Sequence, residues 1–168
     1  SLAANAISQL TEGNKENQNA FAETGAVQPL VAMLASSSPE LQANAAGALS
    51  HRCHNNTENQ AAVARTGAIA PLCALVREGL DIDVKEQSAA ALWSLSHENN
   101  PNKATVAKLG GIEPLVTLLV TGETENSLDQ TVGALGSLCS KHVDNREVIA
   151  KLMVARLGSR IAMVQTPG

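Results

Sequence analysis

The chain has 168 residues, of which 44% are hydrophobic, and a formal net charge of −4 at pH 7, so it is too apolar to be disordered and suits one ordinary domain. No run of lysine and arginine could follow a phosphate backbone, which excludes nucleic acid as an expected partner. No apolar run approaches the roughly 20 residues that cross a bilayer and no signal-peptide pattern opens the chain, so we expect no membrane contact.

Helical segments follow one another along the chain, and they repeat. The segments TGAVQPLVAML from Thr24, TGAIAPLCALV from Thr66 and LGGIEPLVTLL from Leu109 align without gaps, with their prolines 42 and 43 residues apart. An asparagine with the same spacing precedes the first apolar run of each unit: Asn17, Asn59, Asn102 and Asn145. A period of about 40 to 47 residues indicates a helical solenoid.

Each unit is predicted to contain three helices in a fixed order. We expect the asparagine to cap the first helix, a left-handed glycine to end it, and a proline four residues later to open the second helix. The glycines are Gly25, Gly67 and Gly110, and the prolines are Pro29, Pro71 and Pro114. The third and longest helix is predicted to begin near Pro39 after a Ser38 cap, near Asp83 and near Asn126.

Both ends of the chain depart from this pattern. Residues 1–12 supply only a last helix, and the fourth unit has Met153 and Leu157 where the glycine and the proline are due. Terminal repeats usually carry a polar outer face, and neither end has one here. We therefore expect a piece of a longer solenoid whose apolar ends can self-associate end to end.

The order of these residues resembles the armadillo repeat: asparagine, then Gly-Ala-Ile-x-Pro-Leu-Val, then an alanine-rich helix ending in Ala-Leu-x-x-Leu. The resemblance covers essentially the whole chain as one domain. It implies an all-α, right-handed solenoid of three-helix repeats, whose third helices line a concave face where peptides or large protein surfaces dock. We expect about three full repeats, at 13–54, 55–97 and 98–140, with partial repeats at 1–12 and 141–168.

The four histidines are explained by the repeat more readily than by catalysis. His54 and His97 end successive third helices, where a cation is favoured and an imidazole can bond a free carbonyl group. His51 lies three residues before His54, but two imidazoles without a nearby carboxylate or thiolate pair make a weak metal site. His142 is expected in a loop.

The three cysteines, Cys53, Cys73 and Cys139, are interpreted as small packing residues. Their odd number and the lack of CxxC spacing argue against a disulfide framework and against a zinc site. The sequence also lacks a glycine-rich phosphate loop, a nucleophile elbow and an HExxH helix. We therefore expect no enzyme activity, no cofactor and no metal, and an intracellular location in the cytoplasm, with the nucleus as a further compartment.

Family members that grip peptides often place a tryptophan and an asparagine four residues apart on each third helix, and the asparagine clamps the peptide backbone. The positions equivalent to that tryptophan are Asn5, Gly47, Ala90 and Gly133. The positions equivalent to that asparagine are Gln9, His51, Ser94 and Ser137. This departure argues against the nuclear-import-receptor mode, in which aligned tryptophans and asparagines hold a basic nuclear localisation signal.

The expected concave face keeps a floor of glycine and alanine with small polar side chains. The candidate partner-binding residues on it are Asn44, His51, Gln87, Ser94, Gln130 and Ser137. A helix or a broad protein surface would fit against such a nearly bare backbone. The alternative interpretation is that the small residues only allow the helices to pack closely.

Two side chains break the repeat. Arg52 stands where the other units have leucine, and because burial of an unpaired guanidinium is costly, we expect it to reach solvent or to pair with an acid. With His51 and His54 it would form a small basic spot. Trp93 is expected to be buried between helices; if exposed, it is the best candidate for a binding hot spot.

The sequence thus predicts a scaffold or adaptor that binds a protein or peptide on its third-helix face. One alternative is an architectural spacer in a larger cytoskeletal, axonemal or tethering protein. Another is the substrate-recruiting part of a ubiquitin ligase, because residues 95–119, with Asn-Lys before Gly-Gly-Ile-x-Pro-Leu, resemble the repeats of plant U-box ligases.

Overall fold

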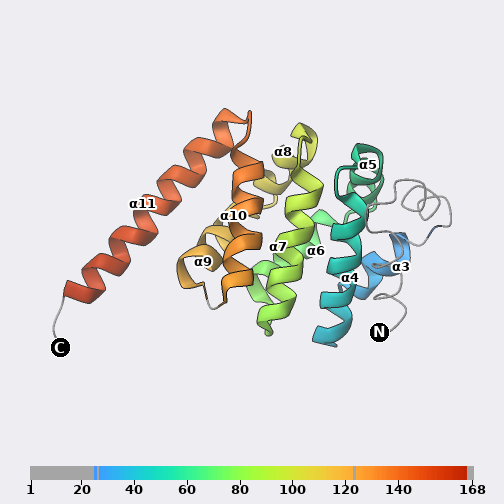
Figure 1. The fold of residues 1–168 in the computed structure, drawn as a ribbon, viewed down its shortest axis with the longest axis horizontal. Coiled ribbons are helices and arrows are strands. Elements are labelled where there is room, and N and C mark those ends of the chain that lie inside the picture. Colours follow the sequence, from blue (N-terminus) through green and yellow to red (C-terminus); the bar gives the residue numbers. More distant parts are fainter. Residues whose placement is uncertain (1–24, 26, 123, 166–168) are drawn as a thin grey trace.

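The computed structural model describes Gly25, residues 27–122 and residues 124–165, with side chains described as far as residue 159. Within these ranges all regular structure is helical, in nine helices named α3 to α11. Figure 1 shows them stacked in a row, with α3 near one end and α11 at the other. The expected all-α solenoid of about three repeats is confirmed. The last helix expected at 1–12, and the expected roles of Asn5, Gln9 and Asn17, lie outside the described residues.

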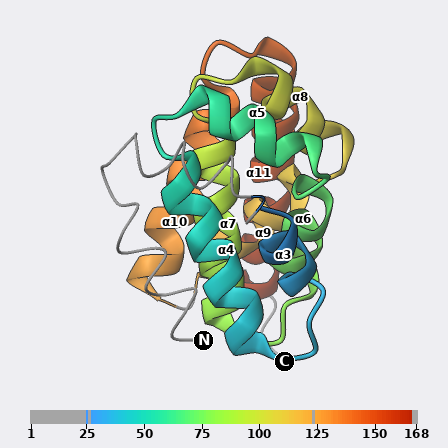
Figure 2. The same cartoon turned by 90° about the vertical axis from the view of Figure 1, so that its right-hand side faces the viewer.

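The helices fall into three sets. The first helices of the repeats are α5 (Thr57–Arg65) and α8 (Asn100–Lys108). The second helices are α3 (Val27–Met33), α6 (Ile69–Glu78) and α9 (Ile112–Thr121). The third helices are α4 (Pro39–Cys53), α7 (Ile82–Ser96) and α10 (Glu125–Cys139). Seen along the row, third helices lie on one side, second helices on the other, and first helices cross the top (Figure 2).

The turn between first and second helices follows the prediction. Gly67 and Gly110 have φ angles of 82° and 71°, in the left-handed region that glycine adopts without steric cost. Each proline lies in the first turn of its second helix, where its missing N–H removes no helical hydrogen bond. Helices α8 and α9 consequently meet at a bend of 81°.

The turn from a third helix into the next first helix uses no glycine. A non-glycine residue adopts a left-handed conformation in each of these turns: Asn55 (φ 52°), Glu98 (φ 52°) and Lys141 (φ 55°). The residue after it caps the next helix with its side chain: Asn56, Asn99 and His142, which accept hydrogen bonds from backbone N–H groups three residues on. The predicted caps at Asn59, Asn102 and Asn145 were wrong, because those residues lie inside the first turn.

These three asparagines, which we call the asparagine ladder, instead join neighbouring helices. Each is buried and donates its amide to a carbonyl near the end of the preceding third helix: Asn59 to Arg52 (3.1 Å), Asn102 to Leu95 (2.8 Å) and Asn145 to Leu138 (3.2 Å). Two of them also donate to the first helix of the preceding repeat: Asn102 to the Gln60 carbonyl and Asn145 to the Lys103 carbonyl, both at 3.4 Å. The ladder therefore sets the register of one repeat on the next.

The residue after each ladder asparagine reaches the following third helix. Gln60 is buried, and its Nε2 atom donates to the carbonyls of Ser94 (2.8 Å) and His97 (3.1 Å) at the end of α7. Lys103 is also buried, and its Nζ atom donates to the Ser140 carbonyl after α10 at 2.6 Å. Burial, with a smaller effect of Lys141, lowers the pKa of Lys103. Both side chains satisfy carbonyls that a helix end leaves free.

The core is a continuous band of small and aliphatic side chains between the helix layers. All alanines of the third helices except Ala90 have almost no exposed surface, which lets these helices approach closely. Cys53 and Cys73 are buried in this core, and burial raises the pKa of each thiol to about 12. Their predicted role as packing residues agrees with these positions.

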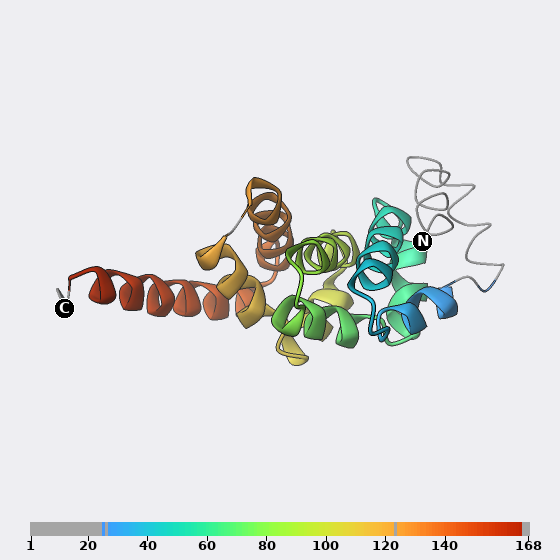
Figure 3. The ribbon, with the colours of Figure 1, turned by 90° about the horizontal axis from the view of Figure 1, so that it is seen from below.

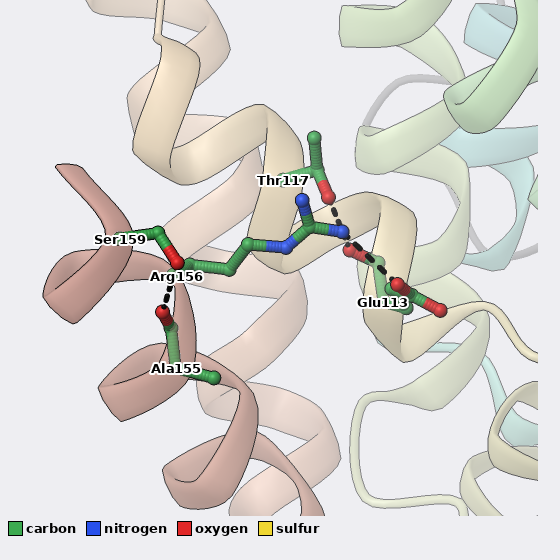
Figure 4. Close-up of polar contacts among 5 residues, drawn as sticks. All are labelled: Glu113, Thr117, Ala155, Arg156 and Ser159. Carbon is green, nitrogen blue, oxygen red and sulfur yellow. Dashed lines mark hydrogen bonds and ion pairs between the residues drawn. The ribbon is translucent and has the colours of Figure 1, made fainter. Parts of the chain in front are cut away.

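Helix α11 (Val143–Gln165) replaces the bent pair of helices in the fourth unit. Because Met153 and Leu157 stand where glycine and proline are due, nothing stops the first helix, and the chain continues straight. Figure 3 shows α11 running past α9 and away from the row. Arg156 Nη2 on α11 donates to Glu113 Oε1 on α9 at 3.0 Å (Figure 4).

Within the described ranges, no single helix is long and apolar enough to cross a membrane. Helices α8 and α9 reach the length and apolar composition of a span only when taken together, and an 81° bend separates them.

Candidate functional site on the third-helix face

The candidate site lies on α4, α7 and α10, which run side by side (Figures 1 and 2). The three amides predicted as contacts, Asn44, Gln87 and Gln130, recur at 43-residue spacing on these helices and are half-buried. His51 on α4 is half-buried as well. A partner lying across the three helices would reach these four side chains.

The two predicted serines are less accessible. Ser94 and Ser137 are both buried. The Ser94 hydroxyl lies 3.1 Å from the Ser50 hydroxyl across α4 and α7. In the described part of the chain, the Ser137 hydroxyl makes no hydrogen bond. Because both hydroxyls are buried, the surface that a partner meets is formed by the more exposed side chains around them.

The floor of the face is not bare backbone. A Cβ atom built on Gly47 would lie 2.9 Å from Gln87 Oε1, so the Gln87 side chain lies over that glycine. Gln87 Nε2 also donates to Asp83 Oδ1 at 3.5 Å. The expectation of a nearly bare floor is corrected: a side chain from the next third helix covers this glycine.

Trp93 covers Gly133 in the same manner. A Cβ atom on Gly133 would lie 2.4 Å from the Trp93 ring, so the ring packs flat against this part of α10. Yet 37% of Trp93 remains exposed. The expectation that Trp93 is buried was wrong, because the missing side chain at 133 gives the ring a place on the surface between α7 and α10.

Different kinds of side chain mark the two ends of the face. Asp83, Glu125 and Asp129 are exposed near the beginnings of the third helices. Glu86 is buried there and accepts hydrogen bonds from Thr124 Oγ1 and Asn126 Nδ2, which fastens the start of α10 to α7. The other end holds the histidines that follow α4 and α7. The face is therefore acidic at one edge and carries imidazoles at the other.

Arg52 does not contribute to that edge as expected. It is buried, with 1% of its surface exposed, and burial lowers the pKa of its guanidinium. The expectation that it reaches solvent was wrong, so the small basic spot with His51 and His54 lacks its guanidinium at the surface. Pairing of Arg52 with an acid stays a prediction.

The titratable side chains in the described part of the chain do not assemble into a metal centre. In the ranges described, no three histidine, cysteine, aspartate or glutamate side chains are placed to hold a metal ion. His54 Nε2 lies 3.1 Å from the Asn55 amide, and His142 Nδ1 caps α11. The arrangement therefore offers contact surface, hydrogen bonds and the exposed ring of Trp93.

Solved structures of designed proteins resemble the chain. A designed armadillo repeat protein in complex with the peptide (KR)4 is 23% identical, with a TM-score of 0.82; the match covers 92% of this chain and 64%, less than two thirds, of that protein. A second designed armadillo repeat protein is 24% identical, with a TM-score of 0.84 and coverage of 99% and 68%. Computationally designed armadillo repeat proteins for modular peptide recognition are represented by a structure with 25% identity, a TM-score of 0.83 and coverage of 94% and 66%.

Sequence comparison assigns the chain to a family. No curated protein matches it. The armadillo/beta-catenin-like repeat, however, matches three times, at residues 14–51, 56–97 and 99–140. Armadillo repeats form a scaffold that commonly binds peptides or proteins. With the bends at Gly67 and Gly110 and the stacked third helices, these matches show that the chain belongs to the armadillo/beta-catenin-like repeat family.

Proposed function

We propose that this chain holds a protein or peptide on its third-helix face, as a scaffold or adaptor without a catalytic step of its own. The observation that carries this proposal is the partly exposed Trp93 ring lying over Gly133. Tryptophan is enriched among the side chains that dominate binding energy at protein interfaces. Exposed faces of solenoids are their usual binding surfaces, and designed armadillo relatives recognise peptides.

The proposed contacts surround this ring. Trp93 supplies the apolar anchor, and Asn44, His51, Gln87 and Gln130 supply hydrogen bonds along the face, while Ser94 and Ser137 support it from below. Gly133 is equivalent to the tryptophan position of family members that grip peptides. Because one ring fills this position from a neighbouring helix, the partner proposed is a segment with one large apolar side chain flanked by polar groups.

Selection of peptides from a display library against the chain tests this proposal. Bound peptides should shift the fluorescence of Trp93, the only tryptophan. Trp93→Ala should weaken binding by about 2 kcal/mol or more, as expected for a hot spot. Leu109→Ala is the matched control, because Leu109 is an exposed apolar side chain at the end of α8, away from this face.

Two results would count against the proposal. Peptides that bind equally well to the Trp93→Ala variant would place the site elsewhere. A failure to select any binder would favour the architectural spacer. The ubiquitin-ligase alternative uses the same face and is tested by whether substrates bound there become ubiquitylated in cells that express the full-length protein.

We also propose that the chain self-associates through the end of the row formed by α10. Val132 on α10 is 56% exposed, whereas the equivalent Ala46 and Ala89 on α4 and α7 are 0% exposed. Sedimentation over a range of concentrations tests this proposal, and a monomer throughout would contradict it. An intracellular location, in the cytoplasm with the nucleus as a further compartment, is proposed from the cysteines and is tested by imaging a tagged chain.

A further inference from the structure

The outer face of α10 has a row of side chains whose equivalents are covered in the other repeats. Helix α7 packs against α4, and α10 packs against α7; Ala46 on α4 and Ala89 on α7 are both fully buried. Val132, the equivalent residue on α10, is 56% exposed, and Leu128 beside it is also exposed. We call Leu128, Val132 and Gly136 the α10 ridge, since they lie four residues apart along one side of the helix.

The ridge is open because the fourth unit does not bend. In the bent repeats, the chain turns back at the glycine and then builds a third helix over its predecessor. Helix α11 instead continues straight and packs against α9 and the end of α10. Among the residues described, no third helix lies beyond α10. The face has the form of a surface that accepts a third helix.

We propose that the α10 ridge binds the α10 ridge of a second copy of this chain, antiparallel and about a two-fold axis at Val132. This inference rests on the self-association proposed above and specifies its geometry. The sizes of the side chains are self-complementary. Leu128 lies four residues before Val132 and Gly136 four residues after it, so Leu128 meets the partner's Gly136. A Cβ atom on Gly136 would have nothing within 4 Å, which leaves room for that leucine.

The charges favour the antiparallel arrangement over the parallel one. Glu125 and Asp129 stand near the beginning of α10, and Lys141 follows its end. An antiparallel pair brings the acidic end of each helix toward the partner's Lys141. A parallel pair would bring acid toward acid and lysine toward lysine, and it would also align the two helix dipoles unfavourably.

The two-fold geometry determines what kind of assembly forms. A contact between identical patches closes at two copies, whereas a head-to-tail contact between different ends continues into a filament. One exposed face of a 15-residue helix is smaller than a standard stable interface. We therefore expect a weak dimer whose population rises with concentration and which forms no larger species.

Sedimentation velocity of the whole chain with Val132→Glu tests the ridge. Because the side chain is exposed in the monomer, the variant should keep its helical circular dichroism while its dimer dissociation constant rises at least about tenfold. Gly136→Leu should have the same effect by filling the space that receives Leu128. Val154→Glu on α11 is the matched control. Val154 is 73% exposed but lies outside the ridge, so this variant should keep the dimer dissociation constant of the wild type.

Cross-linking tests the two-fold axis separately. In a Cys139→Ser background, which removes the one partly accessible cysteine of the three, Val132→Cys should give a disulfide-linked dimer on mild oxidation, and Val154→Cys should not. A wild-type chain that stays monomeric at all concentrations overturns both the self-association and the ridge. A dimer that survives Val132→Glu, or that fails to cross-link through position 132, leaves self-association standing and overturns the antiparallel ridge.

Discussion

Asn102 Nδ2 donates a 2.8 Å hydrogen bond to the Leu95 carbonyl oxygen, and this contact joins the first helix of one repeat to the third helix of the repeat before it. The same amide lies 3.4 Å from the Gln60 carbonyl, 42 residues earlier. One buried side chain on α8 therefore contacts two other helices, α7 and α5. A ladder of such amides explains why asparagine recurs once in every repeat, since only a donor at this site satisfies carbonyls removed from water.

Replacement of Asn102 should be costly. Asn102→Ala leaves the Leu95 carbonyl without its donor, and we expect the free energy of unfolding to fall by about 1–3 kcal/mol. Asn102→Asp should cost more, because a carboxylate presents lone pairs to the carbonyl oxygen. Urea denaturation measures both changes. Asn100→Ala, at an exposed position of the same helix, is the control and should change stability by less than about 0.5 kcal/mol.

Gly133 and Trp93 should be energetically coupled. A methyl group at Gly133 would lie 2.4 Å from the ring, so Gly133→Ala must displace Trp93 and shift its fluorescence. In a Trp93→Ala background the clash is absent, and the same change should stabilise α10 by about 0.5–1 kcal/mol through helix propensity. Gly136→Ala, with open space around it, should show that gain in the native background. A double-mutant cycle with no coupling would disprove the packing of the ring on Gly133.

The straightness of α11 should depend on two side chains. Met153→Gly with Leu157→Pro restores the residues that bend the other repeats, and we expect α11 to break into two helices near residue 153. Small-angle X-ray scattering should then show a shorter maximum dimension, because α11 projects from the row in the native chain (Figure 3). Leu157→Ala alone should leave the dimension unchanged. An unshortened double variant would mean that packing against α9, and not local sequence, keeps the helix straight.

Alkaline pH should destabilise the fold through its buried thiols. The pKa of Cys53 and that of Cys73 rise from 9.0 to about 12 in the folded chain, because burial disfavours the thiolate. The unfolded chain therefore loses these protons first. Their contribution to the free energy of unfolding is complete below pH 9. It is lost as the pH rises toward 12, by about 1.4 kcal/mol per pH unit for each thiol. The lowered pKa of Lys103 acts in the opposite direction and offsets part of this loss.

Thermal unfolding between pH 8 and pH 11 measures that slope. The chain contains no tyrosine, so no phenol titrates in this range. Cys53→Ala with Cys73→Ala should flatten the alkaline decline, at the cost of some stability at neutral pH. Lys103→Met should make the decline steeper, because it removes the opposing contribution. An equal decline in the wild type and in the double alanine variant would contradict the assignment to these thiols.

The local features of the fold were predictable because they depend on single residues with unusual backbone preferences. Gly67, Gly110 and the following prolines mark the bend between first and second helices, and the structure has that bend where the sequence places them. The starts of α4, α7 and α10 lie within one residue of those predicted. The predicted asparagine caps failed because N-terminal caps and inter-helix donors use the same residue type, and only packing shows which carbonyl an amide reaches.

The candidate site was less predictable, since it depends on contacts between repeats. Alignment of the repeats shows that the third helices lack an aligned series of tryptophans and asparagines. It did not show that Trp93 leans from α7 onto Gly133, nor that Gln87 covers Gly47. Side-chain directions across two helices decide both. One signal was present, since a glycine on a neighbouring third helix is the feature that lets a large ring remain at the surface.

The asparagine ladder has a mechanical consequence. Each rung links a carbonyl of one repeat to an amide of the next, at Asn102 and again at Asn145. Because each repeat of a solenoid contacts only its neighbours, a pull along the row must pass through every rung in turn. Rungs loaded in series yield one at a time, so the row should lengthen under tension in steps of one repeat, with the weakest rung fixing the force of the first step.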